Sequence, residues 1–197
     1  MAGNVSSAKA ALRREVDARR RALKSDEVKR LGGEVQKRLA ALLCFRPELT
    51  VGLYAAGPHE VPTQGLFEVA RASGARCAYP RAVPGSRVLD FHEVEDTAIL
   101  VRAALLPVLE PPADAPRVPL EAIDVFVVPG VAFTLRGERL GRGGGHYDTT
   151  LAMSPGRRVA LAWERSLVDE LPVEPTDVPM DVLVTEARVV ICRRPLE

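Results

Sequence analysis

The chain of 197 residues is predicted to adopt an α/β fold with a largely parallel sheet. Two observations lead to this prediction. Short apolar segments rich in β-branched residues alternate along the chain with segments whose apolar residues recur at helical spacing. The chain is also long enough to bury a substantial core, and 47% of its residues are hydrophobic. No internal repeat is present, and we expect residues 1–197 to form a single domain.

Two helices are expected at the start of the chain. Residues 6–24 are dense in Arg and Ala, and Ser6 or Ser7 can cap this helix. A second helix is expected after Ser25-Asp26, because the apolar residues that follow recur every three or four positions. These residues are Val28, Leu31, Val35, Leu39 and Leu42. Gly32-Gly33 weakens the prediction locally, because glycine is a poor helix former.

From residue 50 onward the pattern becomes mostly extended. One helix is expected at 62–74, with Thr63 as a candidate N-cap and Gly74 as its stop. The predicted strands are residues 50–54, 76–80, 87–94, 123–130, 158–163 and 181–191. The last of these could instead be a hairpin that turns at Glu186-Ala187. The prolines at 107, 111, 112, 116 and 119 predict an extended surface crossover.

Composition argues against several classes of protein. The chain has 27 basic and 26 acidic residues and a net charge of +1, so we expect no nucleic-acid partner. The N-terminus has no apolar signal core, and no apolar run approaches the ~18 residues of a membrane span, so we expect no membrane partner. The three cysteines form no CxxC pair and match no zinc spacing. Such scattered cysteines favour reduced thiols and a cytoplasmic location.

The most informative segment is RLGRGGGHYD, residues 139–148. Glycine reaches backbone angles that are closed to other residues, so consecutive N–H groups can point into one concavity and bind phosphate oxygens. Arg139 and Arg142 could add bidentate contacts to the same anion, and a helix that began near Gly145 would add its positive end. A flexible turn with solvated arginines is the alternative, and the residues that flank the glycines favour the anion site. The segment matches neither the P-loop nor the dinucleotide-binding fingerprint.

A longer stretch around these glycines, VVPGVAFTLRGERLGRGGGHYD, resembles the signature of the 5-formyltetrahydrofolate cyclo-ligase family. Four more segments are similar to that family in the same order along the chain. They are SSAKAALRREV at 6–16, HEVPT at 59–63, YPR at 79–81 and LPVEPTDVPMD at 171–181. The glycine segment is strong evidence, each of the others alone is weak, and together they cover nearly the whole chain. The resemblance implies a three-layer α/β/α, Rossmann-like cyclo-ligase fold.

The resemblance also implies an activity. The family converts 5-formyltetrahydrofolate to 5,10-methenyltetrahydrofolate, and cleaves ATP to ADP and phosphate. The implied mechanism transfers a phosphoryl group to the formyl oxygen, after which N10 attacks the activated carbon and phosphate leaves. An amide oxygen is a poor leaving group and its phosphate ester is a good one, which explains the use of ATP. The resemblance therefore implies Mg²⁺ as cofactor and ATP and a reduced folate as small-molecule partners; we also expect a monomer.

Roles for individual residues follow from the same resemblance. The implied ATP-binding residues are Lys9, Arg13, Arg139, Gly141, Arg142, Gly143, Gly144, Gly145, His146 and Tyr147. The implied substrate-binding residues are Glu60, Arg142, His146 and Tyr147. Arg142 and Lys9 are implied to be catalytic, and Asp148 and Asp177 to hold the metal ion.

The residue chemistry suits these roles, although simpler interpretations exist. Lys9 and Arg13 are spaced i, i+4 and would project from one face of a helix. A solvated basic face is the alternative, since Arg14, Arg19, Arg20 and Arg21 follow on the same helix. Tyr54 and Phe91 could line a folate pocket, but core packing is the simpler role for both.

The chain departs from the family pattern at two places near the glycines. His146 stands where many members have Tyr or Phe, and Thr149 where bacterial relatives often have Arg. One alternative function is a cyclo-ligase-like paralogue with another substrate. Another is a non-catalytic nucleotide- or RNA-binding module. A binding module would need the arginines but not the metal carboxylates, so Glu60, Asp148 and Asp177 together favour the enzyme.

Overall fold

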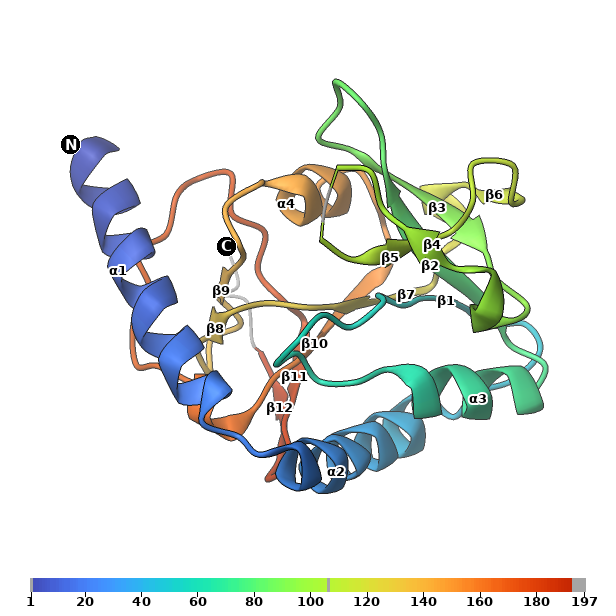
Figure 1. Ribbon diagram of the computed structural model, residues 1–197, viewed down its shortest axis with the longest axis horizontal. Coiled ribbons are helices and arrows are strands. Elements are labelled where there is room, and N and C mark those ends of the chain that lie inside the picture. The colour runs from blue at the N-terminus through green and yellow to red at the C-terminus, as the bar shows by residue number, and fades with distance from the viewer. Residues whose placement is uncertain (1, 106, 193–197) are drawn as a thin grey trace.

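An eight-stranded sheet forms the centre of the computed structural model, which describes residues 2–105 and 107–192, with side chains from residue 5 (Figure 1). Its strand order is β12-β11-β10-β7-β1-β2-β3-β6. The strands are β1 (Thr50–Gly52), β2 (Arg76–Ala82), β3 (Leu89–Glu93), β6 (Arg117–Val118), β7 (Val125–Val128), β10 (Arg157–Leu161), β11 (Val182–Val184) and β12 (Val189–Ile191). The five central strands, from β11 to β2, run parallel, and the outer pairings are antiparallel. The predicted α/β fold with a largely parallel sheet is confirmed.

Helices and short ribbons complete the fold. The helices are α1 (Ala2–Arg21), α2 (Ser25–Leu43), α3 (Gln64–Ala72) and α4 (His146–Leu151), with 3₁₀ turns at Thr97–Ile99, Leu120–Ala122 and Glu164–Ser166. Two-stranded ribbons pair β4 (Val101–Arg102) with β5 (Leu109–Glu110), and β8 (Ala132–Phe133) with β9 (Arg139–Leu140). The proline-rich crossover contains β5 and β6, and the predicted hairpin at the end of the chain is formed by β11 and β12.

Two details of the predicted helix starts are wrong. The first helix begins at Ala2, so neither Ser6 nor Ser7 caps it. Thr63 occupies the N-cap position of α3, but its hydroxyl donates to the carbonyl oxygen of Tyr54 at 2.6 Å and caps nothing. The Thr63 hydroxyl therefore joins the start of α3 to the segment that directly follows β1.

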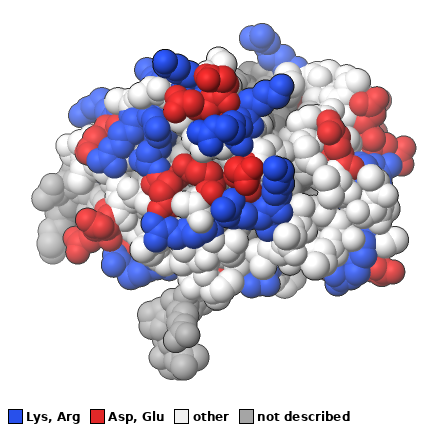
Figure 2. Space-filling model, turned by 90° about the horizontal axis from the view of Figure 1, so that it is seen from below, with Lys and Arg blue, Asp and Glu red and all other residues white. Residues whose placement is uncertain are grey.

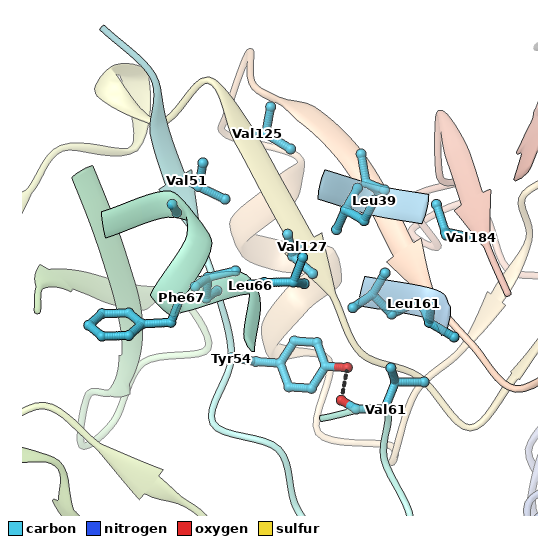
Figure 3. Close-up of a cluster of buried hydrophobic side chains, with 14 of the residues drawn as sticks. Leu39, Val51, Tyr54, Val61, Leu66, Phe67, Val125, Val127, Leu161 and Val184 are labelled. Atoms are coloured by element: carbon cyan, nitrogen blue, oxygen red, sulfur yellow. Dashed lines mark hydrogen bonds between the residues drawn. The ribbon is translucent and has the colours of Figure 1, made fainter. Parts of the chain in front are cut away.

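The alternation of side chains along the strands divides the core between two faces of the sheet. Helices α2 and α3 cover one face, where Leu39 and Leu66 pack with Val51, Val127 and other strand residues (Figure 3). Tyr54 belongs to this core, as its simpler interpretation predicted. Gly32 serves close packing here, because a Cβ atom at that position would lie 2.7 Å from the Pro62 ring. At Gly32, the predicted local weakness of α2 thus accompanies a close contact.

The opposite face of the sheet packs against α4 and the loops around it. Phe91, Phe126 and Val128 point to this side and cluster with Leu151 of α4. Helix α1 lies beside the sheet in Figure 1 and packs through Val16 on the β8–β9 ribbon. The helix that carries Lys9 and Arg13 therefore lies next to the ribbon that leads into the glycine segment.

The connections between the parallel strands indicate which edge of the sheet binds ligands. Strand β1 lies between β2 and β7, so the chain proceeds to one side of β1 first and then to the other. In open α/β sheets, ligands bind outside the carboxyl ends of the strands at such a switch point. The segments that follow β1 and β7 contain Glu60 and the glycines, respectively.

The surface has no single sign of charge on the face that Figure 2 shows. Lys and Arg are interspersed there with Asp and Glu. In the described part of the chain, no helix combines the length and hydropathy needed to span a bilayer.

Candidate functional site

A narrow hollow, almost closed to solvent, lies at the carboxyl ends of β1, β7 and β10. It is lined by residues that follow these strands and by one side chain from α1. The lining includes Arg20, Tyr54, Glu60, Gly130 and Trp163. These residues meet at the edge that the sheet connections indicate.

The glycine segment, residues 141–145, links β9 to α4. Gly143 and Gly145 have φ angles of 102° and 71°, which glycine adopts without strain. No described residue accepts a hydrogen bond from the backbone N–H groups of residues 142–145. Unpaired donors in a glycine-rich turn are what an anion-binding concavity requires. Helix α4 begins at the predicted place but has only six residues, so the backbone donors matter more than its dipole.

The two arginines of this segment have different environments. The Arg139 side chain is 3% exposed, and it donates to Oδ1 of Asp148 at 2.8 Å. Its guanidinium carbon lies 5.7 Å from the centre of the Tyr147 ring, and its Nε has no partner among the described residues. The Arg142 side chain is 54% exposed and lies 3.5 Å from Oε1 of Glu60. The exposed side chain of Arg142 can therefore reorient toward a ligand, whereas the buried side chain of Arg139 is held by Asp148.

Helix α1 places Lys9 and Arg13 on the face toward this site, as the i, i+4 spacing predicts. Lys9 is buried and its Nζ donates to Glu174 and to Asp177, each at 2.7 Å. Burial opposes the positive charge, but the hydrogen bonds to both carboxylates outweigh it and raise the pKa of Lys9. The Nε of Arg13 donates to the carbonyl oxygen of Gly141 at 2.8 Å. The helix is thus joined to the glycine segment and to the chain near Asp177.

Glu60 lies in the loop after β1, with 11% of its side chain exposed. Its Oε2 accepts a hydrogen bond from the backbone N–H of Gly57 at 2.8 Å, and its Oε1 faces Arg142. The loop is anchored to the core, because the buried Tyr54 hydroxyl donates to the carbonyl oxygen of Val61 at 2.7 Å (Figure 3). The structure therefore brings Glu60 and Arg142, 82 residues apart in sequence, into one site.

His146 and Tyr147 begin α4 and have different surroundings. The Nδ1 of His146 lies 3.2 Å from the carbonyl oxygen of Arg87, in the turn between β2 and β3. The Tyr147 hydroxyl is buried and has no hydrogen-bond partner among the described residues. Burial raises the pKa of Tyr147, so the phenol stays protonated and available as a donor.

The two carboxylates expected to hold a metal ion come from neighbouring segments. The backbone N–H of Val178 donates to Oδ1 of Asp148 at 3.3 Å, which places Asp148 beside the residue that follows Asp177. Both carboxylates already have cationic partners, Arg139 and Lys9. The described residues contain no group of three or more His, Cys, Asp or Glu that could hold a metal ion.

Three residues of the site were not found from the sequence. Asp17 and Arg20 continue the stripe of Lys9 and Arg13 along α1, and Glu174 shares the ammonium group of Lys9. The spacing of residues 9, 13, 17 and 20 was a usable signal, since all four lie within one face of a helix. The run of arginines at 19–21 hid it, because only burial distinguishes Arg20 from its neighbours.

Comparisons with known proteins show the family to which the chain belongs. The model of the 5-formyltetrahydrofolate cyclo-ligase family matches residues 5–186. The 5-formyltetrahydrofolate cyclo-ligase of Escherichia coli K12 is 33% identical over 179 residues, which are 87% of this chain and 96% of the relative. The solved structure of the Aquifex aeolicus 5,10-methenyltetrahydrofolate synthetase is 34% identical, covers 96% of both chains and has a TM-score of 0.81. The Mycoplasma pneumoniae 5,10-methenyltetrahydrofolate synthetase is 25% identical, covers 90% of this chain and 98% of its own, and has a TM-score of 0.73. The chain belongs to the 5-formyltetrahydrofolate cyclo-ligase family.

Proposed function

We propose that this protein converts 5-formyltetrahydrofolate to 5,10-methenyltetrahydrofolate and cleaves ATP to ADP and phosphate. The observation that carries the proposal is the convergence of α1, the glycine segment and the Glu60 loop at the switch point of the sheet. Arg13 contacts Gly141, and Arg142 contacts Glu60, so these three parts touch one another. The names of the relatives from E. coli and Aquifex support the same reaction.

The reaction mainly requires the protein to position the phosphates and to stabilise negative charge on their oxygens. The γ-phosphoryl group passes to the formyl oxygen and ADP leaves. The N10 nitrogen then attacks the formyl carbon, the carbon–oxygen bond breaks, and the oxygen departs in inorganic phosphate. Cationic side chains and fixed backbone N–H groups suit both steps, because negative charge moves across the phosphoryl oxygens in each of them.

On the ATP side, we assign the phosphates to Lys9, Arg13, Arg142 and the amides of residues 141–145. Support comes from the unpaired amides of the segment and from the partial exposure of Arg142. The Nε of Arg139 is a buried donor that has no partner among the described residues, and we assign it as a further donor to the bound substrate. Lys9 has to exchange part of its contact with Glu174 and Asp177 for phosphate oxygens.

On the folate side, we assign the pterin ring to Glu60, His146 and Tyr147. A carboxylate accepts strong hydrogen bonds from a guanidine-like N–H edge. Glu60 is held by Gly57 at one oxygen, and its other oxygen becomes available when Arg142 turns toward phosphate. The buried hydroxyl of Tyr147 also has no hydrogen-bond partner in the described part of the chain, and we assign it as a second donor to the pterin ring.

The carboxylates Asp148 and Asp177 fit a magnesium ion that is shared with ATP. Mg²⁺ takes oxygen ligands and is usually held by one or two carboxylates, substrate phosphates and water. These two carboxylates come from adjacent segments, which suits that donor set. When bound, the ion would neutralise charge on the phosphoryl oxygens. The Lys9 and Arg139 cations hold both carboxylates in place until then.

Three wider features belong to the same proposal. The sheet takes strands from residue 50 to residue 191, which supports one cyclo-ligase domain. Cys44, Cys77 and Cys192 form no disulfide, which supports a reducing compartment such as the cytoplasm. We propose a monomer, because one chain supplies every residue assigned to the two substrates.

The purified protein, Mg-ATP and 5-formyltetrahydrofolate test the proposal directly. The amidinium product absorbs light that the substrate does not, so we expect the chromophore and ADP to form in equal amounts. Glu60→Gln should raise the KM for folate far more than the KM for ATP. ADP formation only with another formylated substrate would indicate the paralogue. Nucleotide or RNA binding without turnover of any substrate would indicate the binding module.

A further inference from the structure

Arg20 is a charged side chain in the interior of the protein. It is 1% exposed and lies near the end of α1, while its neighbours Arg19 and Arg21 face solvent. Its guanidinium reaches into the hollow at the carboxyl ends of β1, β7 and β10. A fully buried arginine needs a reason, because removing its charge from water is costly.

The guanidinium of Arg20 holds two backbone carbonyl groups at the site. Its Nε and one terminal nitrogen donate to the carbonyl oxygen of His59 at 3.0 and 2.8 Å. The other terminal nitrogen donates to the carbonyl oxygen of Gly130 at 3.1 Å. Trp163 adds a third donor to the His59 oxygen at 2.9 Å. Arg20 thereby ties the loop after β1 to the turn after β7, at the switch point of the sheet.

The residue that follows this carbonyl is Glu60. His59 has a φ of 67°, an unusual value for a residue with a side chain, so its peptide group needs to be held in place. The Nε and one terminal nitrogen of Arg20 are two of the three donors that hold the carbonyl oxygen of His59. The direction in which the Glu60 side chain leaves the backbone depends directly on this peptide.

The charge of Arg20 also acts on the site. Burial lowers the pKa of Arg20, and among the charges that oppose this effect Glu60 has the largest influence. The nearest carboxylate contact is with Asp17 at 3.6 Å, and Asp17 also lies 3.9 Å from Arg142. A neutral donor could satisfy the carbonyl of His59 at a lower desolvation cost. A cation at this position is therefore better explained by the carboxylates near it, with Asp17 in contact and Glu60 acting over a longer distance, than by the turn alone.

We propose that Arg20 is a positioning residue for the folate site: it orients the His59-Glu60 peptide and, through that peptide, the Glu60 carboxylate that receives the pterin ring. The inference rests on the proposed function of Glu60. Arg20 touches neither substrate, and Lys9 and Arg13 on the same helix act on the phosphates. A change at Arg20 should thus affect one substrate and leave the other nearly unaffected.

The test compares Arg20→Lys and Arg20→Met with the wild-type protein and with Arg19→Met. Arg19 is the matched control, since it lies next to Arg20 on α1 but its side chain is 43% exposed. We expect Arg20→Met to raise the KM for 5-formyltetrahydrofolate at least tenfold and the KM for ATP less than twofold. Arg20→Lys, which keeps the charge but loses the fork, should fall between Arg20→Met and wild type. Arg19→Met should match wild type.

Binding and stability measurements separate the possible outcomes. Titration calorimetry with 5-formyltetrahydrofolate alone gives affinity without turnover, and urea unfolding shows whether each variant is folded. If Arg20→Met does not fold, Arg20→Lys decides the question, since a folate-specific rise in KM supports the inference. Equal loss for both substrates, or no change in either, would overturn it. An inactive wild-type protein that still binds ATP would refute the proposed function first, and the role of Arg20 with it.

Discussion

Arg142→Ala separates the catalytic role of the glycine segment from its structural role. The Arg142 side chain is 54% exposed, and its carboxylate contacts are 3.5 Å to Glu60 and 3.9 Å to Asp17. Exposed ion pairs of this kind contribute roughly 0–1 kcal/mol to stability. Loss of one preorganised donor to a transition state costs roughly 2–4 kcal/mol, which is roughly a 30- to 900-fold fall in kcat/KM. We therefore expect a folded protein with a severe loss of ATP use.

The assay follows the methenyl chromophore at varied ATP concentration, with urea unfolding of the same preparations. Arg136→Ala is the matched control, because Arg136 is similarly exposed, lies in the turn of the β8–β9 ribbon and pairs with Glu138 at 3.1 Å. The control should keep wild-type kinetics. A folded Arg142→Ala protein with near-normal kcat/KM for ATP would refute the phosphate assignment. A fall in stability as large as the fall in activity would instead assign Arg142 to the fold.

Four further predictions concern stability, metal dependence and pH dependence. Gly33→Ala should raise the free energy of unfolding by about 0.5–1 kcal/mol, because a Cβ atom there meets nothing within 4 Å. Gly156→Ala should lower the free energy of unfolding by about 1–3 kcal/mol, because its Cβ would lie 2.3 Å from the carbonyl oxygen of Ile123. Urea midpoints that rise for Gly156→Ala or fall for Gly33→Ala would contradict the corresponding prediction. Asp148→Asn should raise the Mg²⁺ concentration needed for half-maximal rate, and an unchanged Mg²⁺ titration would remove Asp148 from the metal site. The hydrogen bond from Arg188 lowers the pKa of Glu164 in the folded protein. The pair therefore stabilises the fold above the pKa that Glu164 has in the unfolded chain, and this stabilisation is lost as the pH falls through the pKa of Glu164 in the folded protein. Wild type should lose more stability than Glu164→Gln from about pH 6 to about pH 3, measured by urea unfolding at each pH.

Local patterns were enough to predict the main elements of the fold. The apolar stripe of α2 and the β-branched run of β7 are visible in the sequence, because backbone sterics and side-chain periodicity act over a few residues. The i, i+4 spacing placed Lys9 and Arg13 on one helical face for the same reason. The ribbon of β8 and β9 was not predicted, since strands of two residues have no period to detect.

The sequence by itself determined the α/β class, the glycine segment and the set of charged residues that the family resemblance marks. Only the tertiary structure decided how those charges pair. It buried Arg20 between the exposed Arg19 and Arg21, placed Arg142 against Glu60, and joined Lys9 to Asp177 across 168 positions of the chain. Helical and extended periods arise from neighbours along the chain, whereas burial and ion pairing depend on the strand order, and that order is set by packing between distant segments.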